Sequence, residues 1–335
     1  MTGAFEGLEL VCPSCRGPVK ATPEAFTCSR CGVSYPVVAG IPDFRVVPDP
    51  WIDLEADRAK GIRLERETEG QDFEAVVRAY WAMTPDTPRE AAERFISHVL
   101  GAERRSREWL DSITGPTDHR HPARWLDIGC GTADLAVAAW PGAEVVGIDV
   151  AFRWLVVARR RLVASGVPVR LVCCNAEALP FPDASFDRAL SLGMIEHATS
   201  SQAALRESRR VLRSGATLQV RTVNRYSLLA EPHVGVWGTG WLPRRWADRY
   251  VRWRTGQGYL HHDPLSAGRL ARELRQAGFR AVGVESAAVL PSERKRLGRS
   301  LARLIPAYEF VRRSRILGRV IRAIAPLLEG HGVAA

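Results

Sequence analysis

Short apolar runs alternate with stretches of helical periodicity through the central part of the chain. Six runs have the length and composition of strands: ARWLDIG, AEVVGIDV, VRLVCCN, DRALSLGM, ATLQVRTV and RAVGVES. Such alternation is typical of βαβ units, in which the strands form a parallel sheet and ligands bind at the carboxyl ends of the strands. The pattern therefore predicts an α/β fold with a doubly wound, mainly parallel sheet.

The segments on either side of this region have other patterns. The first residues combine short strands with the turn-rich sequences CPSC and CSRC, and a charged stretch follows in which Phe95, Val99 and Leu100 recur at helical spacing. The end of the chain is helical and basic. We predict a small N-terminal module (1–48), a helical cap or linker (49–118), the α/β domain (119–290) and a basic helical tail (291–335).

Residues 225–262 interrupt the alternation with aromatic side chains among glycines and prolines. The aromatic residues are Tyr226, Trp237, Trp241, Trp246, Tyr250, Trp253 and Tyr259. A long loop at this place predicts a lid. The tryptophans either line a pocket for a large, partly apolar ligand or form the core of an inserted subdomain, and the sequence does not separate these two interpretations.

Length and composition restrict the class of protein. With 335 residues, of which 46% are hydrophobic, the chain can bury one large core and still form a second, small module. The N-terminal sequence MTGAFEGLEL has neither a basic nor an apolar signal region, and no run of 18 apolar residues occurs. We therefore expect a soluble, cytoplasmic protein.

Most of the net charge of +10 lies in the tail, because residues 291–330 hold ten Lys or Arg against three Glu. Arginines there alternate with apolar residues such as Phe310, Leu317 and Val320, which predicts an amphipathic basic helix. This helix either makes peripheral contact with an anionic membrane surface or packs on its own domain with its arginines in solvent. We favour the second interpretation.

Four of the seven cysteines form two CxxC pairs, Cys12/Cys15 and Cys28/Cys31, with twelve residues between the pairs. Two such pairs supply four thiolates for tetrahedral coordination, which favours zinc in a reducing compartment. Because the protein then fills all four positions, we expect the metal to be structural. It would compensate for a module too small to form its own core.

The segment WLDIGCGTADLA, residues 125–136, is the most informative part of the sequence. A buried strand ends at Asp127, and Gly129 and Gly131 let the backbone turn tightly beside a ligand before a helix begins. The dinucleotide pattern G-x-G-x-x-G would need a glycine where Asp134 stands, and the Asp127 carboxylate would repel a pyrophosphate. The same carboxylate suits a ligand that carries an ammonium and a sulfonium.

The next strand ends in Asp149, 22 residues after Asp127. A carboxylate at this strand tip can accept hydrogen bonds from both hydroxyls of a ribose. A site that binds a nucleoside and a sulfonium but not a pyrophosphate predicts S-adenosylmethionine as the cofactor.

In this region the chain resembles the class I methyltransferase superfamily, in particular the small-molecule methyltransferases that include the ubiquinone and menaquinone C-methyltransferases. The resemblance covers about residues 122–286 and rests on LDIGCGT, VVGIDV, CNAEALPFPDASFDRALSLGMIEHA and RRVLRSGATLQV in family order. It implies a Rossmann-like, seven-stranded sheet and methyl transfer from S-adenosylmethionine. The cofactor-binding residues that it implies are Asp127, Gly129, Cys130, Gly131, Asp149, Val150, Asn175, Ala176, Glu177 and Leu192.

Within this set the resemblance places Asp127, Gly129 and Gly131 at the methionine moiety, Asp149 at the ribose, and residues 175–177 at the adenine. This chain has Asn175 where the family commonly has Asp, and Ala133 in place of a third glycine. An Asn carbonyl can still accept from the adenine amino group, so we expect weaker or altered binding.

The N-terminal module resembles the Trm112-like zinc ribbon family, most closely through its ending YPVVAGIPDF. The resemblance implies a docking surface or a wall on the substrate side. A stabilising appendage explains the same residues, and both interpretations stay open.

Methyl transfer to a hydroxyl also needs a base that takes its proton. Glu196 and His197 follow the fourth strand of the predicted sheet, and His197 is the predicted base. In the alternative interpretation this pair caps the next helix or packs on the loop. Further candidates for the base, whose positions the sequence does not give, are His233, His261, His262 and Tyr80.

Three classes of function fit these features. The first is O-methylation of a small-molecule or lipid- or glycan-linked acceptor in secondary-metabolite or glycan biosynthesis, with quinone-type C-methylation close to it. The second is an rRNA guanine N-methyltransferase, although the four Cys ligands and the lack of RNP or KH signatures argue against nucleic acid as a partner. The third is a non-catalytic partner, which the intact glycine and acidic motifs oppose. We predict the first.

Overall fold

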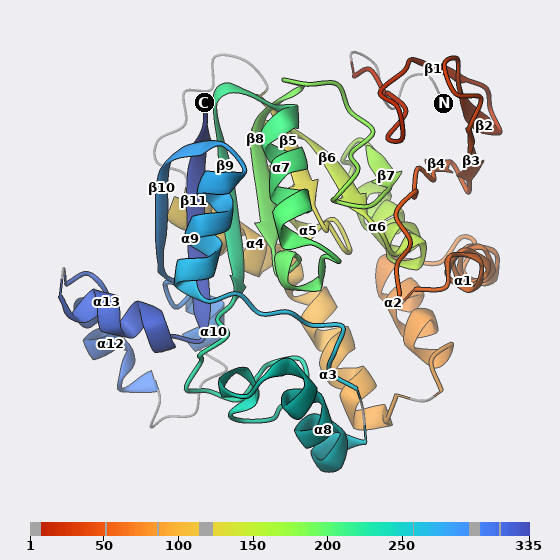
Figure 1. Ribbon diagram of the computed structural model, residues 1–335. Helices are drawn as coiled ribbons and strands as arrows, with labels where there is room; N and C mark the ends of the chain where they lie inside the picture. The colour runs from red at the N-terminus through yellow and green to blue at the C-terminus, as the bar shows by residue number, and fades with distance from the viewer. Residues whose placement is uncertain are drawn as a thin grey trace. The chain divides into compact units, whose positions relative to one another are not determined.

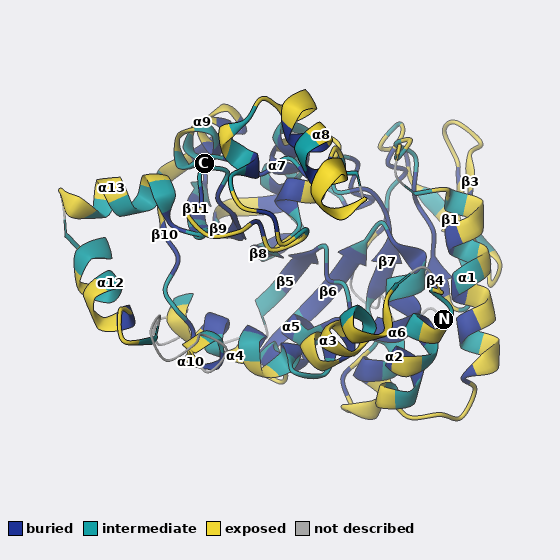
Figure 2. Ribbon diagram, turned by 90° about the horizontal axis from the view of Figure 1, so that it is seen from below, coloured by how far each residue is buried: buried dark blue, intermediate teal, exposed yellow. Residues whose placement is uncertain are grey.

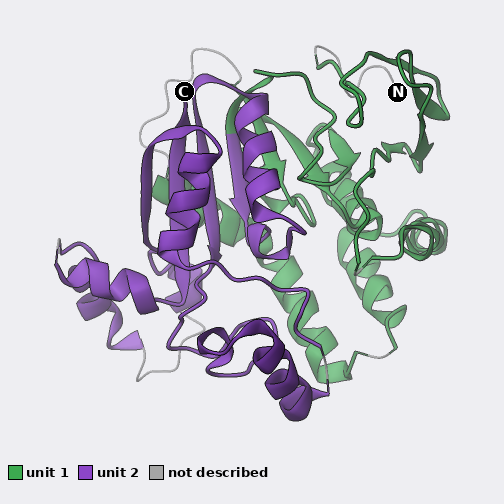
Figure 3. Cartoon of the chain, viewed as in Figure 1, with its two compact units in different colours: residues 1–188 green, residues 189–335 purple. Residues whose placement is uncertain are grey.

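The computed structural model describes residues 8–50, 52–85, 87–113, 123–256, 258–294, 302–314 and 316–335 (Figure 1). The chain divides into two compact units, residues 1–188 and 189–335 (Figure 3). The boundaries predicted after residues 48, 118 and 290 stay predictions. Among the described helices, none is both long enough and apolar enough to cross a membrane.

The N-terminal module, here called the ribbon, is a four-stranded antiparallel sheet in the order β1-β2-β3-β4. Its strands are β1 (Val19–Ala21), β2 (Ala25–Cys28), β3 (Ser34–Val38) and β4 (Ile41–Pro42). The Phe44 ring packs between Tyr35 and Phe26, with ring centroids 4.7 and 5.3 Å apart. Because only a few aromatic side chains pack together, the core of the ribbon is small, as the sequence predicts.

The chain leaves the ribbon alongside β7 (Leu171–Cys173). Asp43 forms a parallel bridge with Cys173, and the N–H of Phe44 donates to the Cys173 carbonyl at 2.7 Å. The exit of the ribbon is therefore paired with an edge strand of the α/β part of the same unit.

A buried cluster of charges stabilises this junction. Arg45, whose side chain is 1% exposed, donates to Asp43 and Asp57 at 2.7 Å each. Arg58 makes a second ion pair with Asp43 at 2.8 Å, and Arg153 pairs with Asp57. Each buried carboxylate has two guanidinium partners, so neither charge is left without compensation.

The helical cap consists of α1 (Leu54–Glu67), α2 (Phe73–Ala82), α3 (Arg89–Leu100) and α4 (Ala102–Ile113). The carboxylates of Asp53 and Asp72 accept the backbone N–H of the third residue after them, at 2.8 Å each, and so cap α1 and α2. The helical character predicted for this segment is confirmed.

Unit 1 continues with β5 (Ala123–Ile128), β6 (Ala143–Asp149) and β7, which pair in parallel. The helices α5 (Asp134–Ala139) and α6 (Phe152–Ala164) connect them. Five of the seven residues of β6 are buried, as the dark strand in Figure 2 shows. Such a continuous apolar strand is typical of a parallel sheet with both faces covered.

The remaining elements are β8 (Phe186–Leu192), η2 (Ile195–His197), α7 (Ser201–Val211), β9 (Leu212–Val223), η3 (Thr239–Trp241), α8 (Arg244–Thr255), α9 (Ala267–Gln276), β10 (Phe279–Ser286), α10 (Pro291–Arg294), α12 (Ile305–Arg312), α13 (Leu317–Ile324) and β11 (Leu327–Ala334). Hydrogen bonds order the described strands of the large sheet as β10-β11-β9-β8-β5-β6-β7. The predicted α/β fold with a mainly parallel seven-stranded sheet is confirmed.

The prediction of a helical tail is wrong for its last residues. Strand β11 pairs antiparallel with both β9 and β10. A Cβ at Gly332 would lie 2.7 Å from the Cβ of Phe279 in β10, so glycine permits the close approach of these strands. Two glycines and a short apolar ending give the segment little strand character in the sequence.

The insertion at residues 225–262 has a small core of its own, formed by Val236, Ala247, Val251 and Tyr259. All four tryptophans of the insertion expose half of their surface or more, and Trp253 is the most exposed at 76%. The other three are Trp237, Trp241 and Trp246. The interpretation of the tryptophans as core residues is therefore wrong.

The tail helices also differ from the favoured expectation. The apolar side chains of Phe310, Leu317 and Val320 are exposed by 78%, 51% and 58%. Arg322 instead points inward and donates to the Val284 carbonyl of β10 at 3.0 Å. These positions therefore do not form the expected helix with a buried apolar face and an arginine face in solvent.

Candidate functional site

A turn with left-handed backbone joins β5 to α5. Gly129, Gly131 and Ala133 have φ values of 76°, 50° and 57°. The N–H groups of Gly129 and Cys130 donate to the Ile148 carbonyl of β6 at 2.9 and 2.8 Å. An alanine in this conformation costs roughly 1–2 kcal/mol, which explains why the family pattern has a third glycine at position 133.

Asp149 closes β6 and orients the turn. Its Oδ2 accepts the N–H of Gly131 at 2.9 Å, and its Oδ1 accepts the N–H of Ala151 at 2.8 Å. Burial raises the pKa of Asp149, although these two hydrogen bonds act in the opposite direction. Each carboxylate oxygen keeps a lone pair, so the predicted acceptance of two ribose hydroxyls is compatible with this geometry.

Asp127 lies in β5 opposite Gly147 of β6 and is 3% exposed. Burial raises its pKa well above the usual range, and the charges of Asp134 and Asp149 raise it further. Two buried carboxylates at neighbouring strand ends destabilise each other unless a cation lies beside them. This electrostatic arrangement favours a positively charged ligand, and it brings together the residues predicted for the methionine and ribose moieties.

Asn175 has a role that the sequence does not predict. Its Oδ1 accepts the backbone N–H groups of Val46 and Val47 at 3.1 Å each, and its Nδ2 donates to the Val47 carbonyl at 3.1 Å. Both lone pairs of the amide oxygen are used, so this oxygen cannot also accept from an adenine amino group. The side chain instead holds the segment that follows the ribbon.

The other predicted cofactor residues lie at strand ends. The Val150 carbonyl, directly after β6, accepts Nη1 of Arg45 at 3.0 Å. Cys130 is buried in the turn, Ala176 and Glu177 are half-buried after β7, and Leu192 is the half-buried last residue of β8 in the second unit. Cofactor binding by these residues stays a prediction.

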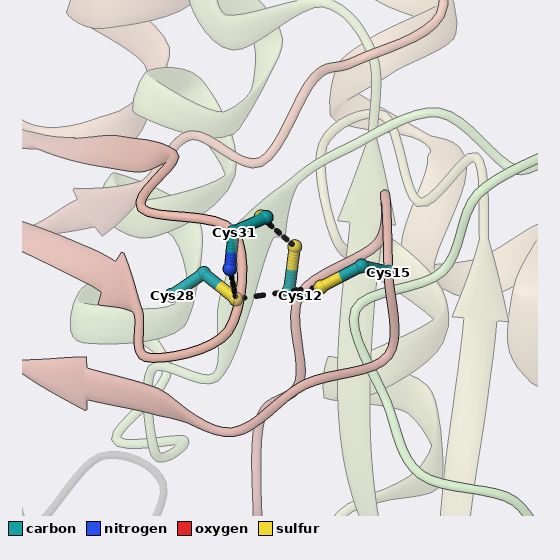
Figure 4. Close-up of side chains that lie close together, drawn as sticks. All are labelled: Cys12, Cys15, Cys28 and Cys31. Carbon is teal, nitrogen blue, oxygen red and sulfur yellow. Dashed lines mark hydrogen bonds between the residues drawn. The ribbon is translucent and has the colours of Figure 1, made fainter.

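The four cysteines of the ribbon converge on one point (Figure 4). Their sulfur atoms all lie within 4.8 Å of one another. The Cys12 sulfur is 3.7 Å from that of Cys31, and the Cys15 sulfur is 3.5 Å from that of Cys28. None forms a disulfide. The donor set and its spacing match a tetrahedral thiolate metal site.

Backbone and side-chain donors surround these sulfurs. The N–H groups of Arg30 and Cys31 lie 3.4 and 3.5 Å from the Cys28 sulfur, and the Tyr35 hydroxyl lies 3.0 Å from the Cys12 sulfur. Such hydrogen bonds stabilise thiolates, the form in which cysteine binds a metal.

In the second unit, three of the predicted base candidates meet in what is here called the histidine cluster: His197, His233 and His262. Each offers a ring nitrogen, and these nitrogens lie within 4.8 Å of one another. The Nε2 atoms of His197 and His233 are 3.1 Å apart. His197 lies in η2, directly after β8, whereas His233 and His262 come from the two ends of the insertion.

Glu231 orients the cluster. Its Oε1 lies 2.6 Å from Nδ1 of His233, and its Oε2 accepts the backbone N–H groups of His233 and Val234 at 3.0 Å each. The sequence does not predict this role for Glu231, because nothing marks this glutamate except its place two residues before His233. With Nδ1 bonded to a carboxylate, Nε2 of His233 faces the cluster.

The three imidazoles differ in proton affinity. Burial lowers the pKa of His262 to about 2, and repulsion from the neighbouring histidines acts in the same direction. Desolvation and the charge of His233 likewise lower the pKa of His197 to about 3. Burial would lower the pKa of His233 too, but the hydrogen bond and charge of Glu231 raise it above its usual value. At neutral pH, His197 and His262 therefore carry unprotonated nitrogens.

Glu196 and Tyr80 are not members of the histidine cluster, although the charge of Glu196 helps to raise the pKa of His233. Glu196 is 1% exposed, and its Oε2 accepts the Thr222 hydroxyl at 2.7 Å. The next helix is capped by Ser200 rather than by the Glu196–His197 pair. Tyr80 belongs to the first unit, where its ring stacks on Trp154, with centroids 4.2 Å apart. His261 packs on His262, with ring centroids 3.9 Å apart.

Comparisons with known proteins agree with the α/β part of the chain. A family model described as a methyltransferase domain matches residues 126–220. A demethylmenaquinone methyltransferase of Thermus thermophilus is 43% identical over 30% of this chain and 46% of its own length. The chain thus spans about half the length of this relative.

Two further relatives are matched over more of their length. A ubiquinone/menaquinone biosynthesis C-methyltransferase of Cupriavidus metallidurans is 33% identical over 52% of this chain and 75% of its own length. A malonyl-acyl-carrier-protein O-methyltransferase of Methylococcus capsulatus is 33% identical over 56% of this chain and 66% of its own length. Together with the glycine turn and the two strand-end carboxylates, this similarity shows that the chain belongs to the class I S-adenosylmethionine-dependent methyltransferases.

Proposed function

We propose that this methyltransferase acts on a hydroxyl oxygen of an acceptor that carries an apolar chain, such as a lipid-linked metabolite or glycan. The observation that carries the proposal is a cavity of about 580 Å³ in the second unit. Its wall is almost wholly apolar and includes Leu228, Leu229, Val289, Leu304, Ile321 and Ile324. A volume of this size is typical of ligand sites, which are usually apolar with a few polar groups.

The position of the cavity supports the same conclusion. Ala287, Ala288 and Val289, which follow directly on β10, form part of its wall. Ligands of open α/β sheets bind beyond the carboxyl ends of the strands. The tail helices α12 and α13 also line the cavity, through residues such as Val311 and Ile321.

The cavity and the histidine cluster share one segment of chain. Leu229 lines the large cavity and also a small one that Glu231 borders. Glu231 in turn bonds His233. An apolar chain in the large cavity would therefore leave a polar head group on the side of the histidines.

The reaction that we propose needs a proton acceptor there. The acceptor oxygen attacks the methyl carbon in line with the sulfonium, so that a C–O bond forms and the S–C bond breaks. The products are a methyl ether, S-adenosylhomocysteine and a proton. His197 is the proposed base, and its hydrogen bond to His233 lets the proton pass to the His233–Glu231 pair, whose carboxylate raises the pKa of His233.

Labelled S-adenosylmethionine tests this function. Methyl transfer is measured with a lipid extract and with a long-chain alkyl glycoside and its methyl analogue. Val289→Trp, which fills the cavity, is expected to raise KM for the long-chain acceptor at least about 10-fold without changing turnover of the methyl analogue. Val163→Trp, at a 64% exposed position on α6, is the matched control. Label found only in RNA or protein would contradict the proposal.

Quinone-type C-methylation is the second candidate. It is favoured by the similarity to quinone C-methyltransferases, and the same apolar cavity would accept a hydrophobic tail. The position of the label distinguishes the two candidates, because acid cleaves a labelled methyl ether more readily than a ring-carbon methyl group.

We also infer that Cys12, Cys15, Cys28 and Cys31 bind one structural zinc ion. The convergence of four sulfurs supports this, and so do the N–H donors around Cys28. With four thiolates no coordination position remains for a substrate, so the ion would stabilise the ribbon and its paired exit strand.

A further inference from the structure

We propose that the histidine cluster, His197, His233 and His262, binds one divalent transition-metal ion and leaves one coordination position open for the oxygen of the acceptor. Metal binding itself stands on the geometry of the cluster. The assignment of the open position to the acceptor rests on the proposed function.

The spacing of the nitrogens fits a metal ion. The Nε2 atoms of His197 and His233 are 3.1 Å apart, and all three candidate nitrogens lie within 4.8 Å. In a tetrahedral site with metal–nitrogen bonds of about 2.0–2.1 Å, ligand nitrogens lie about 3.3 Å from one another. The three rings are already in mutual contact, with centroids 4.3 to 4.7 Å apart. Small ring rotations would complete the site.

Hydrogen bonds within the protein do not satisfy every ring nitrogen of the histidine cluster. One hydrogen bond joins His197 to His233. His262 is 6% exposed, and its Nδ1 has no hydrogen-bond partner among the residues that the structure describes. A buried polar atom without a partner costs free energy, which a bound cation would recover.

Glu231 gives the cluster the partner that metal-binding histidines usually have. Its Oε1 bonds Nδ1 of His233 at 2.6 Å, and the residue is 5% exposed. A carboxylate in this position selects the tautomer whose Nε2 is free to bind a metal and makes that nitrogen more basic. The two backbone N–H groups that bond its Oε2 hold the carboxylate in place.

The donor set indicates the class of metal and its chemistry. Three neutral imidazoles favour zinc, cobalt, nickel or iron over magnesium and calcium, which prefer oxygen ligands. Because the ligands carry no charge, the ion keeps its double positive charge and acidifies a coordinated hydroxyl. A His197 that coordinates the metal no longer serves as the base, so the coordinated hydroxyl would release its proton to solvent. The metal-bound oxygen would then form the C–O bond as the S–C bond breaks.

Cobalt(II) titration of the full chain, after brief treatment with chelator that leaves the ribbon metal in place, tests the site. We expect one equivalent of cobalt to bind with ligand-field bands but without thiolate charge-transfer absorption. His197→Ala and His262→Ala should weaken this binding at least about 100-fold, and Glu231→Gln about 10- to 100-fold. His331→Ala, at an exposed histidine on β11, is the control and should bind cobalt like the unchanged chain.

Circular dichroism and S-adenosylmethionine binding show whether each variant is folded. Equal cobalt affinity in all folded variants, or absorption from thiolate-bound cobalt alone, would overturn the proposal. The proposed function is read separately. If no metal binds and long-chain acceptors are still methylated, the metal inference fails and the function stands. If cobalt binds and no such acceptor is methylated, the metal inference stands and the proposed function fails.

Discussion

The side chain of Asn175 and the backbone of Val47 hydrogen-bond in both directions, with N–H···O distances of 3.1 Å each way. Asn175 follows β7 at the predicted adenine side of the cofactor site, whereas Val47 begins the segment after the ribbon. This pair therefore joins the ribbon to the strand end where the cofactor site is predicted, within the first unit. An aspartate in place of Asn175 could accept the two N–H groups but not donate to the carbonyl.

Asn175→Ala is expected to destabilise the first unit by about 1–3 kcal/mol, because two backbone N–H groups lose their buried acceptor. Limited proteolysis should then cleave the segment after the ribbon faster. Urea unfolding and mass spectrometry of the fragments measure both effects. Lys20→Ala, on an exposed ribbon position, is the control. Unchanged stability and unchanged cleavage would show that the pair is dispensable.

Asp127→Asn should weaken S-adenosylmethionine binding at least about 10-fold, or about 1.4 kcal/mol, because the positive cofactor loses a buried carboxylate. The raised pKa of Asp127 has a further consequence. A cationic ligand favours its ionised form, so binding should release protons and affinity should rise with pH until the free carboxyl is ionised. Calorimetry in buffers of different ionisation enthalpy measures the release. Asp111→Asn, on the exposed face of α4, should behave like the unchanged chain.

Asp57→Ala is expected to cost about 3–5 kcal/mol, because it leaves the buried Arg45 guanidinium without one of its partners. Thermal unfolding measures the loss. Glu67→Ala on the same helix removes the exposed Arg63–Glu67 pair, and its cost should stay below about 1 kcal/mol. Equal costs for the two variants would contradict the structural role given to the buried pair.

Stability should also depend on pH through Asp43. Burial alone would raise the pKa of this carboxyl, but the hydrogen bonds and charges of Arg45 and Arg58 lower it below its usual 3.8. Since the folded-state pKa lies below that of the unfolded chain, the stabilisation is complete above the unfolded value and is lost as the pH falls toward the folded value. Unfolding free energies measured between pH 6 and about pH 3 should fall less steeply in Asp43→Asn. An identical slope would exclude this contribution.

Removal of the ribbon metal is expected to unfold the ribbon. A strong chelator should release the ribbon zinc ion, and Cys28→Ser should lose this ion on purification, because the small aromatic core around Phe44 cannot compensate. A colorimetric zinc assay measures the release. Ser29→Ala, an exposed neighbour in the same knuckle, should retain the ion. A ribbon that stays folded and protease-resistant without metal would contradict this expectation.

Local pattern was sufficient for the glycine turn and for the cysteine ribbon. Asp127, Gly129 and Gly131 lie within five residues of one another, and each CxxC pair shares one knuckle. In both cases short-range backbone geometry decides where the side chains point, and a strand followed by a turn has few alternatives. For this reason their spacing along the chain predicted their arrangement.

Packing over long distances decided the rest. His197, His233 and His262 are separated by 36 and 29 residues, and only the folded insertion brings their rings together and sets Glu231 behind one of them. The same holds for β11, whose glycine-rich sequence has weak strand propensity and becomes a strand by pairing with β9 and β10. It holds again for Asn175, whose partners lie 128 residues away at Val47. Such contacts depend on shape and hydrogen-bond partners in three dimensions, which periodicity along the chain does not encode.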